Sequence, residues 1–314
     1  MSNHMMQAIR VHQYGGPEQL KLEQIPCPVP RPGELLIRVH ATGVLPVEWK
    51  IRQGAFHAFQ PAAFPYIPGS AFAGVVEEVG GGAAFQKGQA VFGRSNKGTY
   101  AEYTTASGEV VALKPASLSF DEAATISGGA TTAWTALFEN GAMQKGQRVL
   151  IHGAAGGVGS FAVQFARLKG AQVIGTASTA NVEFVRALGA ETVIDYTSTP
   201  FEQVAHDVDL VLDTIGGETL QRSMSVVKRG GTLVSLLQQP SQEKARELGI
   251  HAMKNTAALP FPSTNLLQTI AQLIAESQVK VTLSRIFPLR EANLAHELSQ
   301  SGHGRGRIVL HIAD

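Results

Sequence analysis

Residues 149–159, with the sequence VLIHGAAGGVG, decide the fold of this chain. Three apolar residues, 149–151, are typical of the end of a buried parallel strand, and the glycines and alanines that follow permit a sharp turn without Cβ clashes. Residues 160–168 then have helical spacing, and residues 171–176 predict a second strand. A strand, glycine turn and helix in this order present free N–H groups and a positive helix end to a pyrophosphate. The stretch therefore predicts a dinucleotide-binding unit, with an ordinary tight turn as the alternative.

The composition is that of a globular chain long enough for two domains. The chain has 314 residues, of which 44% are hydrophobic and 16% charged, and its formal net charge is +1. A near-neutral chain without a basic stripe argues against nucleic acid or an anionic membrane surface as a partner. The sequence has no apolar run of about 18 residues, which argues against a transmembrane helix. Residues 1–5 resemble an expression-tag remnant and not a signal peptide, so we expect a cytoplasmic protein.

The single cysteine, Cys27, restricts the chemistry that is available to the chain. One cysteine forms no intrachain disulfide, and it cannot supply a zinc site with four cysteine ligands. The ten histidines are scattered and form no H-E-x-x-H pair. No serine or cysteine nucleophile is paired with a base, so a hydrolase is disfavoured. We therefore expect no bound metal and a reaction that needs none.

The pattern of short strands and helices divides the chain into parts. Residues 7–115 are rich in short β signals, Pro and Gly, which predicts a partly open β barrel with strands at 7–11, 34–41, 73–80, 90–92 and 99–103. Residues 118–140 have a helical period, with Asp121 and Glu122 in the first turn. Residues 148–237 alternate strand and helix, with later strands at 193–196, 208–213 and 230–237.

This alternation predicts a parallel sheet with helices on both faces, so the fold class is α/β. A helix at 263–277, a helix at 289–300 and a strand at 307–312 follow, without any nucleotide-site signal. We therefore expect a first domain over 1–126, a nucleotide-binding domain over 127–262, and a return to the first domain over 263–314.

The residues after the second predicted strand bear on the choice of cofactor. NAD enzymes place an acid about 20 residues beyond the glycine turn, where it accepts hydrogen bonds from the ribose hydroxyls. Residues 176–181 contain no acid. Hydroxyl and amide donors such as Ser178 and Asn181 suit a 2′-phosphate, and Arg186 is a candidate for added charge. This pattern favours NADPH, although both Ser178 and Asn181 are also ordinary helix-capping residues.

The whole chain resembles the zinc-free quinone oxidoreductase branch of the medium-chain dehydrogenase/reductase superfamily. The matching segments, in order, are 43–54, 65–69, 73–76, 132–134, the glycine turn, 188–190, 213–217 and 303–310. The resemblance implies a GroES-like β-barrel catalytic domain and a Rossmann domain. It also implies NADPH-dependent reduction of a quinone or an α,β-unsaturated carbonyl (an enone). Relatives carry an Asn where this chain has Leu45, and an Asp where it has Ala71, which predicts a more apolar pocket floor.

The resemblance assigns cofactor contacts to specific positions. Eight residues of the nucleotide-binding domain are expected to bind the cofactor: Thr132, Ala155, Gly156, Gly157, Val158, Ser178, Asn181 and Leu236. Tyr196 matches a tyrosine that closes over the 2′-phosphate. Arg307 matches a basic residue near the cofactor, with a surface arginine at a strand start as the alternative.

The expected catalytic residues lie in the first domain. Negative charge develops on the acceptor oxygen during hydride transfer, so a cation or donor is needed near it. By family position Lys50 lies beside the nicotinamide ribose and is the first candidate, with a solvated surface lysine as the alternative. Tyr66 is a second candidate donor, unless it only packs beside Pro65 and Pro68. Leu45 completes the wall opposite the nicotinamide ring together with Thr132.

The sequence is also compatible with two other functions, and it predicts an assembly state. An enoyl-thioester reductase shares the expected fold and cofactor. A non-catalytic NADPH-binding protein is suggested by the loss of polar groups at Leu45 and Ala71. Strand 232–237 is expected near an edge of the parallel sheet, close in sequence to the apolar segment 256–262. An exposed apolar edge invites pairing with another copy, and relatives form two-fold dimers through this region, so we expect a homodimer.

Overall fold

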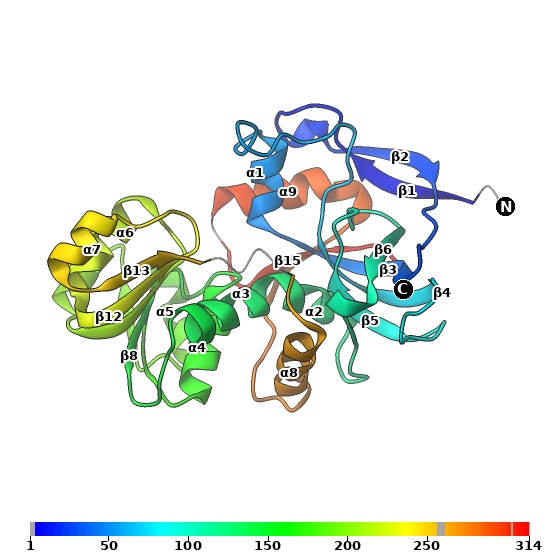
Figure 1. Ribbon diagram of the computed structural model, residues 1–314. Helices are drawn as coiled ribbons and strands as arrows, with labels where there is room; N and C mark the ends of the chain where they lie inside the picture. Colours follow the sequence, from blue (N-terminus) through cyan, green and yellow to red (C-terminus); the bar gives the residue numbers. More distant parts are fainter. Residues whose placement is uncertain (1–3, 256–260, 303, 314) are drawn as a thin grey trace. The chain divides into compact units, whose positions relative to one another are not determined.

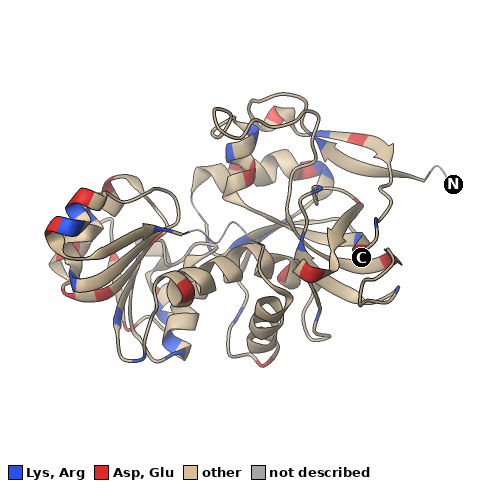
Figure 2. Cartoon of the chain, in the orientation of Figure 1, with Lys and Arg blue, Asp and Glu red and all other residues tan. Residues whose placement is uncertain are grey.

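The computed structural model describes residues 4–255, 261–302 and 304–313 of the chain (Figure 1). The chain divides into two compact units. The first unit draws on Met1–Gly128, Phe261–Ser277 and Val281–Asp314, and the second on Gly129–Pro260 and Gln278–Lys280. In both units Lys and Arg are interspersed with Asp and Glu (Figure 2).

A seven-stranded sheet is the frame of the first unit. The strand order is β14-β15-β3-β4-β5-β7, and β6 also pairs with β3. β14 and β15 run parallel, whereas the other neighbours are antiparallel. The strands are β3 (Glu34–Val44), β4 (Ala71–Val79), β5 (Ala90–Arg94), β6 (Tyr103–Ser107), β7 (Val111–Leu113), β14 (Leu283–Pro288) and β15 (Arg307–His311).

The long strand β3 gives this sheet its barrel-like character. One edge of β3 pairs with β4 over most of its length. The start of β3 also pairs with β6 and its end with β15, so β3 has neighbours on both edges. A buried apolar core lies against the strands, formed by Leu35, Ile37, Val39, Phe72, Val76, Val91, Ala106 and Val111.

Short elements surround this sheet. Strands β1 (Met5–Arg10) and β2 (Lys21–Pro26) form an antiparallel pair. The helices of the unit are α1 (Pro46–Arg52), α2 (Phe120–Thr125), α8 (Thr264–Ala275) and α9 (Ala292–Ser301), and α1 lies beside α9 (Figure 1). The expected strand at 99–103 is wrong, because only Ala101 forms an isolated bridge there, with Ala8, and the strand begins at Tyr103.

The second unit contains a fully parallel six-stranded sheet. Its strand order is β10-β9-β8-β11-β12-β13. The strands are β8 (Arg148–Ile151), β9 (Gln172–Ala177), β10 (Thr192–Asp195), β11 (Val208–Asp213), β12 (Val227–Ser235) and β13 (His251–Lys254). The helices between them are α4 (Gly159–Leu168), α5 (Val182–Leu188), α6 (Gly217–Ser223) and α7 (Gln242–Leu248).

The order of these strands reverses at one point in the sheet. From β8 the chain steps outward to β9 and β10, and from β11 it steps the other way to β12 and β13. Right-handed crossovers therefore place α4 and α5 on one face and α6 and α7 on the other. The order reverses between β8 and β11, and open α/β sheets bind ligands outside the carboxyl ends of the strands at such a point.

The helical stretch expected at 118–140 comprises α2, the π-helical turn η3 (Ile126–Ala130), α3 (Thr131–Trp134) and a second π-helical turn, η4 (Thr135–Asn140). Ser119 caps its start: the Ser119 hydroxyl accepts from the Glu122 N–H, and the Glu122 carboxylate accepts from the Ser119 N–H. Trp134 and Phe138 lie on one face, with ring centroids 4.6 Å apart. The first π-turn includes Gly128 and Gly129, and a Cβ at Gly128 would lie 2.6 Å from Leu45 Cδ2.

Candidate functional site

The glycine turn after β8 is built so that α4 begins directly against the strand end. Gly153 has a φ of 64°, in the left-handed region that favours glycine. A Cβ at Gly159 would lie 2.1 Å from the Gly153 carbonyl oxygen. A Cβ at Gly156, in contrast, would meet only that same oxygen, at 3.3 Å. Gly153 and Gly159 therefore serve the turn itself, whereas Gly156 leaves open the space above it.

The turn also presents unused hydrogen-bond donors. Within the described chain, the backbone N–H groups of Ala155, Gly157 and Val158 donate to no protein acceptor. The Gly156 N–H donates to the Gly153 carbonyl at 2.9 Å. The free N–H groups precede the ten-residue helix α4, whose N-terminus carries a partial positive charge. Donors and helix end together fit the pyrophosphate of a dinucleotide.

A buried histidine anchors this turn to its neighbours. Burial lowers the pKa of His152 to about 4, so its ring is neutral at neutral pH. The Ser223 hydroxyl donates to the Thr219 carbonyl at 2.6 Å and therefore accepts from His152 Nε2 at 2.9 Å. His152 Nδ1 is left to accept from the Thr176 hydroxyl at 3.1 Å, and that hydroxyl accepts from the Gly153 N–H at 3.3 Å. This network connects β8, β9 and α6 beneath the turn.

Ser178 and Asn181 lie where β9 ends, and they contact one another. The Asn181 side-chain amide donates to the Ser178 hydroxyl at 3.1 Å. Each residue occupies an N-cap position, but neither side chain makes the capping hydrogen bond. Arg186, the candidate for added charge, is paired with Glu183 on the exposed surface of α5.

An acid that sequence reasoning missed lies beside these residues. Asp195 ends β10 and is in register with Ala177 of β9. Its carboxylate accepts from the hydroxyls of Thr179 and Thr197, both at 2.6 Å. The Thr179 hydrogen bond, followed by that of Thr197, lowers the pKa of Asp195, so the carboxylate stays ionised. Asp195 is remote from position 178 in the sequence, and only the parallel pairing of β10 with β9 brings it there.

Two more residues that are expected to contact the cofactor come directly after strands of the second unit. Tyr196 comes directly after β10, is 57% exposed, and donates its N–H to the Ala177 carbonyl at 3.1 Å. Leu236 follows β12, and its N–H donates to the Asp213 carbonyl at 2.9 Å. Because parallel strands share one carboxyl edge, these residues lie along the same edge as the glycine turn. Thr132 is apart from them in sequence, on α3, which packs against α4.

Leu45, Lys50, Tyr66 and Arg307 belong to the first unit. Leu45 is buried at the start of α1, and Lys50 lies on the same helix with its Nζ 5.4 Å from the Trp49 ring centroid. The Tyr66 hydroxyl is shielded from solvent and has no partner in the described chain, and burial raises its pKa to about 12. Arg307, at the start of β15, is only 4% exposed, so the surface-arginine interpretation is wrong.

A chain of buried hydrogen bonds underlies α1, and sequence reasoning missed it. Burial lowers the pKa of His296 to about 3, so its ring is neutral. Arg52 Nε donates to His296 Nδ1 at 3.3 Å, which leaves His296 Nε2 to donate to the Tyr100 hydroxyl at 3.1 Å. Tyr100 then donates to Glu48, whose carboxylate also accepts from the Leu45 N–H at 2.9 Å. The only sequence signal was Glu48 itself, three residues after Leu45 in a helix-start pattern.

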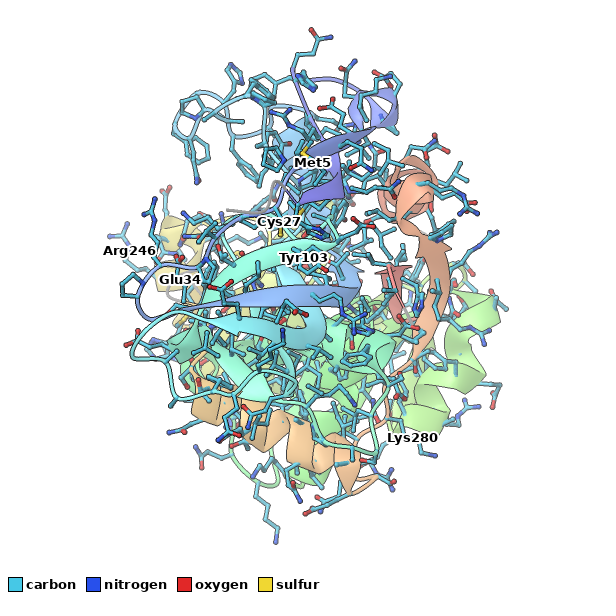
Figure 3. All side chains as sticks on the ribbon, turned by 90° about the vertical axis from the view of Figure 1, so that its right-hand side faces the viewer. Met5, Cys27, Glu34, Tyr103, Arg246 and Lys280 are labelled. Carbon is cyan, nitrogen blue, oxygen red and sulfur yellow. The ribbon has the colours of Figure 1, made fainter. Side chains whose placement is uncertain are left out.

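The described residues also bear on metal binding and on insertion into a membrane. Among them, no three His, Cys, Asp or Glu side chains are grouped as a metal site. Cys27 is half-buried just after β2, near Met5 and Tyr103 (Figure 3). The described helices include none with the length and apolar character needed to cross a bilayer.

Comparison with known proteins places the whole chain. A family model described as the alcohol dehydrogenase GroES-like domain matches residues 31–116, and one described as zinc-binding dehydrogenase matches residues 188–310. Mouse (Mus musculus) quinone oxidoreductase is 34% identical in an alignment 325 positions long, which covers 98% of this chain and 98% of the relative.

Two solved structures extend the comparison. The quinone oxidoreductase of Coxiella burnetii is 35% identical and superposes with a TM-score of 0.91, over 98% of this chain and 99% of that one. A mycobacterial protein solved in complex with NADPH is 28% identical, with a TM-score of 0.88 over 98% of this chain and 99% of that one. These matches confirm the α/β fold class with its GroES-like and Rossmann parts. The chain belongs to the zinc-free quinone oxidoreductase branch of the medium-chain dehydrogenase/reductase superfamily, a family of oxidoreductases that use a nicotinamide cofactor.

Proposed function

We propose that this protein is an NADPH-dependent reductase that transfers a hydride to a quinone or to an α,β-unsaturated carbonyl compound, without a metal ion. The observation that carries the proposal is the glycine turn. Its unused N–H groups at Ala155, Gly157 and Val158 meet the start of α4 at the switch point of a parallel sheet. Family membership supports the substrate class, since the mouse and Coxiella burnetii relatives are named quinone oxidoreductases.

The residues of this chain serve binding and charge stabilisation. The glycine turn holds the pyrophosphate, and the cofactor supplies the hydride when bound. We assign to Lys50 the stabilisation of the negative charge that develops on the acceptor oxygen. Tyr66 is the second donor: with a pKa of about 12 its hydroxyl stays protonated at neutral pH and has a hydrogen bond to give. Leu45 and Thr132 are each proposed as a contact of the nicotinamide ring when the cofactor is bound.

NADPH is proposed over NADH for two reasons. Residues 176–181 contain no acid that would repel a 2′-phosphate, and Ser178 and Asn181 offer hydroxyl and amide donors there. The carboxylate of Asp195 is nearby, but both of its oxygens already accept hydrogen bonds from threonines. The mycobacterial relative that was solved with NADPH is consistent with this choice. Tyr196, exposed at the end of β10, is proposed to cover the phosphate.

The decisive experiment is a panel of acceptors. Loss of the absorbance of the reduced nicotinamide is followed with quinones, simple enones and enoyl thioesters, at equal NADPH. Turnover with quinones or enones is the expected result. Turnover with enoyl thioesters alone would identify the protein as an enoyl-thioester reductase. NADPH binding by calorimetry without turnover of any acceptor would identify a non-catalytic binding protein, the alternative that Leu45 and Ala71 suggest.

We also propose that the protein forms a homodimer through the edge of the parallel sheet. β12 (Val227–Ser235), which contains most of the expected segment 232–237, is the last strand but one, and β13 is the edge strand. Residues 256–260 of the apolar segment 256–262 lie outside the described residues. The mass measured by light scattering at micromolar concentration should be twice that of the 33.3 kDa chain. A monomeric mass at that concentration would contradict the proposal.

A further inference from the structure

Three strands of the first unit bring Gly43, Ala71 and Arg94 into one row. Gly43 pairs with Ala71 between β3 and β4, and Ala71 pairs with Arg94 between β4 and β5. Directly opposed residues of antiparallel strands point to the same face of the sheet. Arg307 Nη2 lies on that face as well, 3.6 Å from the position that a Cβ at Gly43 would take. The side chains of Arg94 and Arg307 therefore share one patch, which we call the arginine pair.

The arginine pair has hydrogen-bond donors without acceptors. Arg307 is 4% exposed, and both its Nε and its Nη2 are shielded from solvent without a partner in the described chain. The Nε of Arg94 is likewise shielded from solvent and has no hydrogen-bond partner in the described chain. Arg94 has two other contacts: its Nη1 donates to the Ser127 carbonyl at 3.0 Å, and its guanidinium lies 5.1 Å from the Phe261 ring centroid. Unpaired charged donors out of water are costly, so an acceptor is expected for them.

The arginine pair also carries more positive than negative charge. Glu48 is the carboxylate that acts on both guanidiniums, but it accepts its hydrogen bonds from the Leu45 N–H and from the hydroxyls of Tyr100 and Ser70. Burial lowers the pKa of Arg307 to about 10, which still leaves it protonated at neutral pH. Two cations thus face one carboxylate. Ala71, between Arg94 and Gly43 in the row, is fully buried and supplies no charge.

We propose that Arg94 and Arg307 form a binding site for one oxyanion, the carboxylate or phosphoryl group of a ligand. A single oxyanion would accept from the unused N–H groups and balance the excess charge, and guanidinium groups suit two-oxygen acceptors. The inference goes beyond the proposed reduction and does not depend on turnover, because anion binding is measured on the protein alone. The anion has two candidate sources, the substrate and the phosphates of the cofactor.

The first test supplies an oxyanion, sulfate, and removes each arginine in turn. Thermal unfolding is measured in sodium sulfate and in sodium chloride of equal ionic strength, for the wild type and for Arg94→Met, Arg307→Met and Arg31→Met. Arg31 is an exposed arginine away from the row and reports the general stabilisation by sulfate. The rise of Tm from chloride to sulfate should be equally large in the wild type and in Arg31→Met. It should be smaller in Arg94→Met and in Arg307→Met, which lack one of the two guanidiniums. An equal rise in all four proteins would overturn the proposal.

A second pair of variants tests the charge argument. Ala71→Asp places a carboxylate in the row between the two guanidiniums, and Ala71→Asn places a neutral group of the same shape there. Ala71→Asp should raise Tm in chloride above that of Ala71→Asn and abolish the extra rise in sulfate. Calorimetric titration with inorganic phosphate should show at least a tenfold loss of affinity in Arg307→Met. These titrations keep the inference open to refutation if Ala71→Asp fails to fold.

Two measurements on Arg94→Met then distinguish the two sources of the anion: the KM for an enone and the affinity for NADPH. A higher KM for an enone that bears a carboxylate, with an unchanged KM for its amide, identifies the substrate. A weaker calorimetric affinity for NADPH, with both KM values unchanged, identifies the phosphates of the cofactor. Wild-type values for both affinities and for inorganic phosphate would overturn the proposal.

Discussion

Glu48 accepts a hydrogen bond from the hydroxyl of Tyr100 at 2.7 Å, and both side chains are buried in the first unit. The Tyr100 hydroxyl in turn accepts from His296. A carboxyl group in this position holds the first turn of α1, because it also binds the Leu45 N–H. The proposed catalytic Lys50 lies on that same helix, so its position depends on this buried pair.

Glu48 predicts a specific dependence of stability on pH. Burial raises its pKa from 4.5 to about 7. Because the folded-state pKa is the higher one, its contribution is fully present below the unfolded value and is lost as pH rises through about 7. A difference of this size corresponds to roughly 3 kcal/mol in the free energy of unfolding.

The matched variant for this prediction is Glu48→Gln, which keeps the shape and does not titrate. Relative to the variant, the wild type should lose stability as pH rises from the unfolded pKa of 4.5 to the folded pKa of about 7, measured by denaturant unfolding at each pH. Taking the difference between the two proteins cancels His152 and His296, whose lowered pKa values act in the opposite direction. Parallel pH profiles would show that Glu48 titrates normally.

The two glycines of the turn should respond differently to substitution. Gly159→Ala places a Cβ 2.1 Å from the Gly153 oxygen, so it should lower the free energy of unfolding by several kcal/mol. At Gly156 a Cβ would have one protein atom within 4 Å, the Gly153 carbonyl oxygen at 3.3 Å, so Gly156→Val should strain the turn far less than Gly159→Ala while it fills the space assigned to the pyrophosphate. It should retain nearly the Tm of the wild type and lose NADPH binding. Thermal unfolding and titration calorimetry separate the two effects, and wild-type binding by Gly156→Val would remove the turn from the site.

Cofactor preference should follow the charge beside Ser178. NADPH should bind at least tenfold tighter than NADH, since a charge-assisted contact to the phosphate is worth roughly 1.5–3 kcal/mol. Ser178→Asp should narrow or invert this ratio by repulsion. Asp195→Asn should widen it, because it removes the ionised carboxylate that the two threonines hold. The ratio is measured by titration calorimetry with both cofactors, and equal affinities in the wild type would refute the preference.

Lys50→Ala should lower kcat more than it weakens NADPH binding. The proposed contact strengthens only as negative charge develops on the acceptor oxygen, so its loss appears in the transition state. Lys50→Arg retains the charge and should recover part of the rate. Lys97→Ala, which removes an exposed lysine of the same unit, is the control. Unchanged kinetics in Lys50→Ala would leave the nucleotide site standing and remove Lys50 from catalysis.

Activity should be independent of zinc. The chain has one cysteine, and the described residues contain no cluster of metal ligands. Turnover should survive EDTA and dialysis, and elemental analysis should find no stoichiometric zinc. One equivalent of zinc whose removal abolishes turnover would overturn the metal-free mechanism.

Helices and strands could be predicted from the sequence where residues close together in the chain determine the structure. The strand–turn–helix over 149–168 depends on glycine sterics and helical spacing within one short segment, and the structure has β8, the turn and α4 there. The start of α2 was equally visible, because Ser119 and Glu122 cap one another across three residues. By contrast, β2 and β14 are half-exposed edge strands without clear alternation, and short helices such as α1 and α7 have too few turns for a period.

The sequence by itself determined the family, the parallel sheet of the second unit and the glycine turn that we propose as the pyrophosphate site, because these depend on contiguous residues and on segment order. Only the tertiary structure decided which charges meet. Asp195 reaches Thr179 through the pairing of β10 with β9. Arg94 and Arg307, more than two hundred positions apart, meet through β5, β4, β3 and β15. Electrostatic interaction depends on distance in space and on burial, and strand pairing determines both for residues that are remote along the chain.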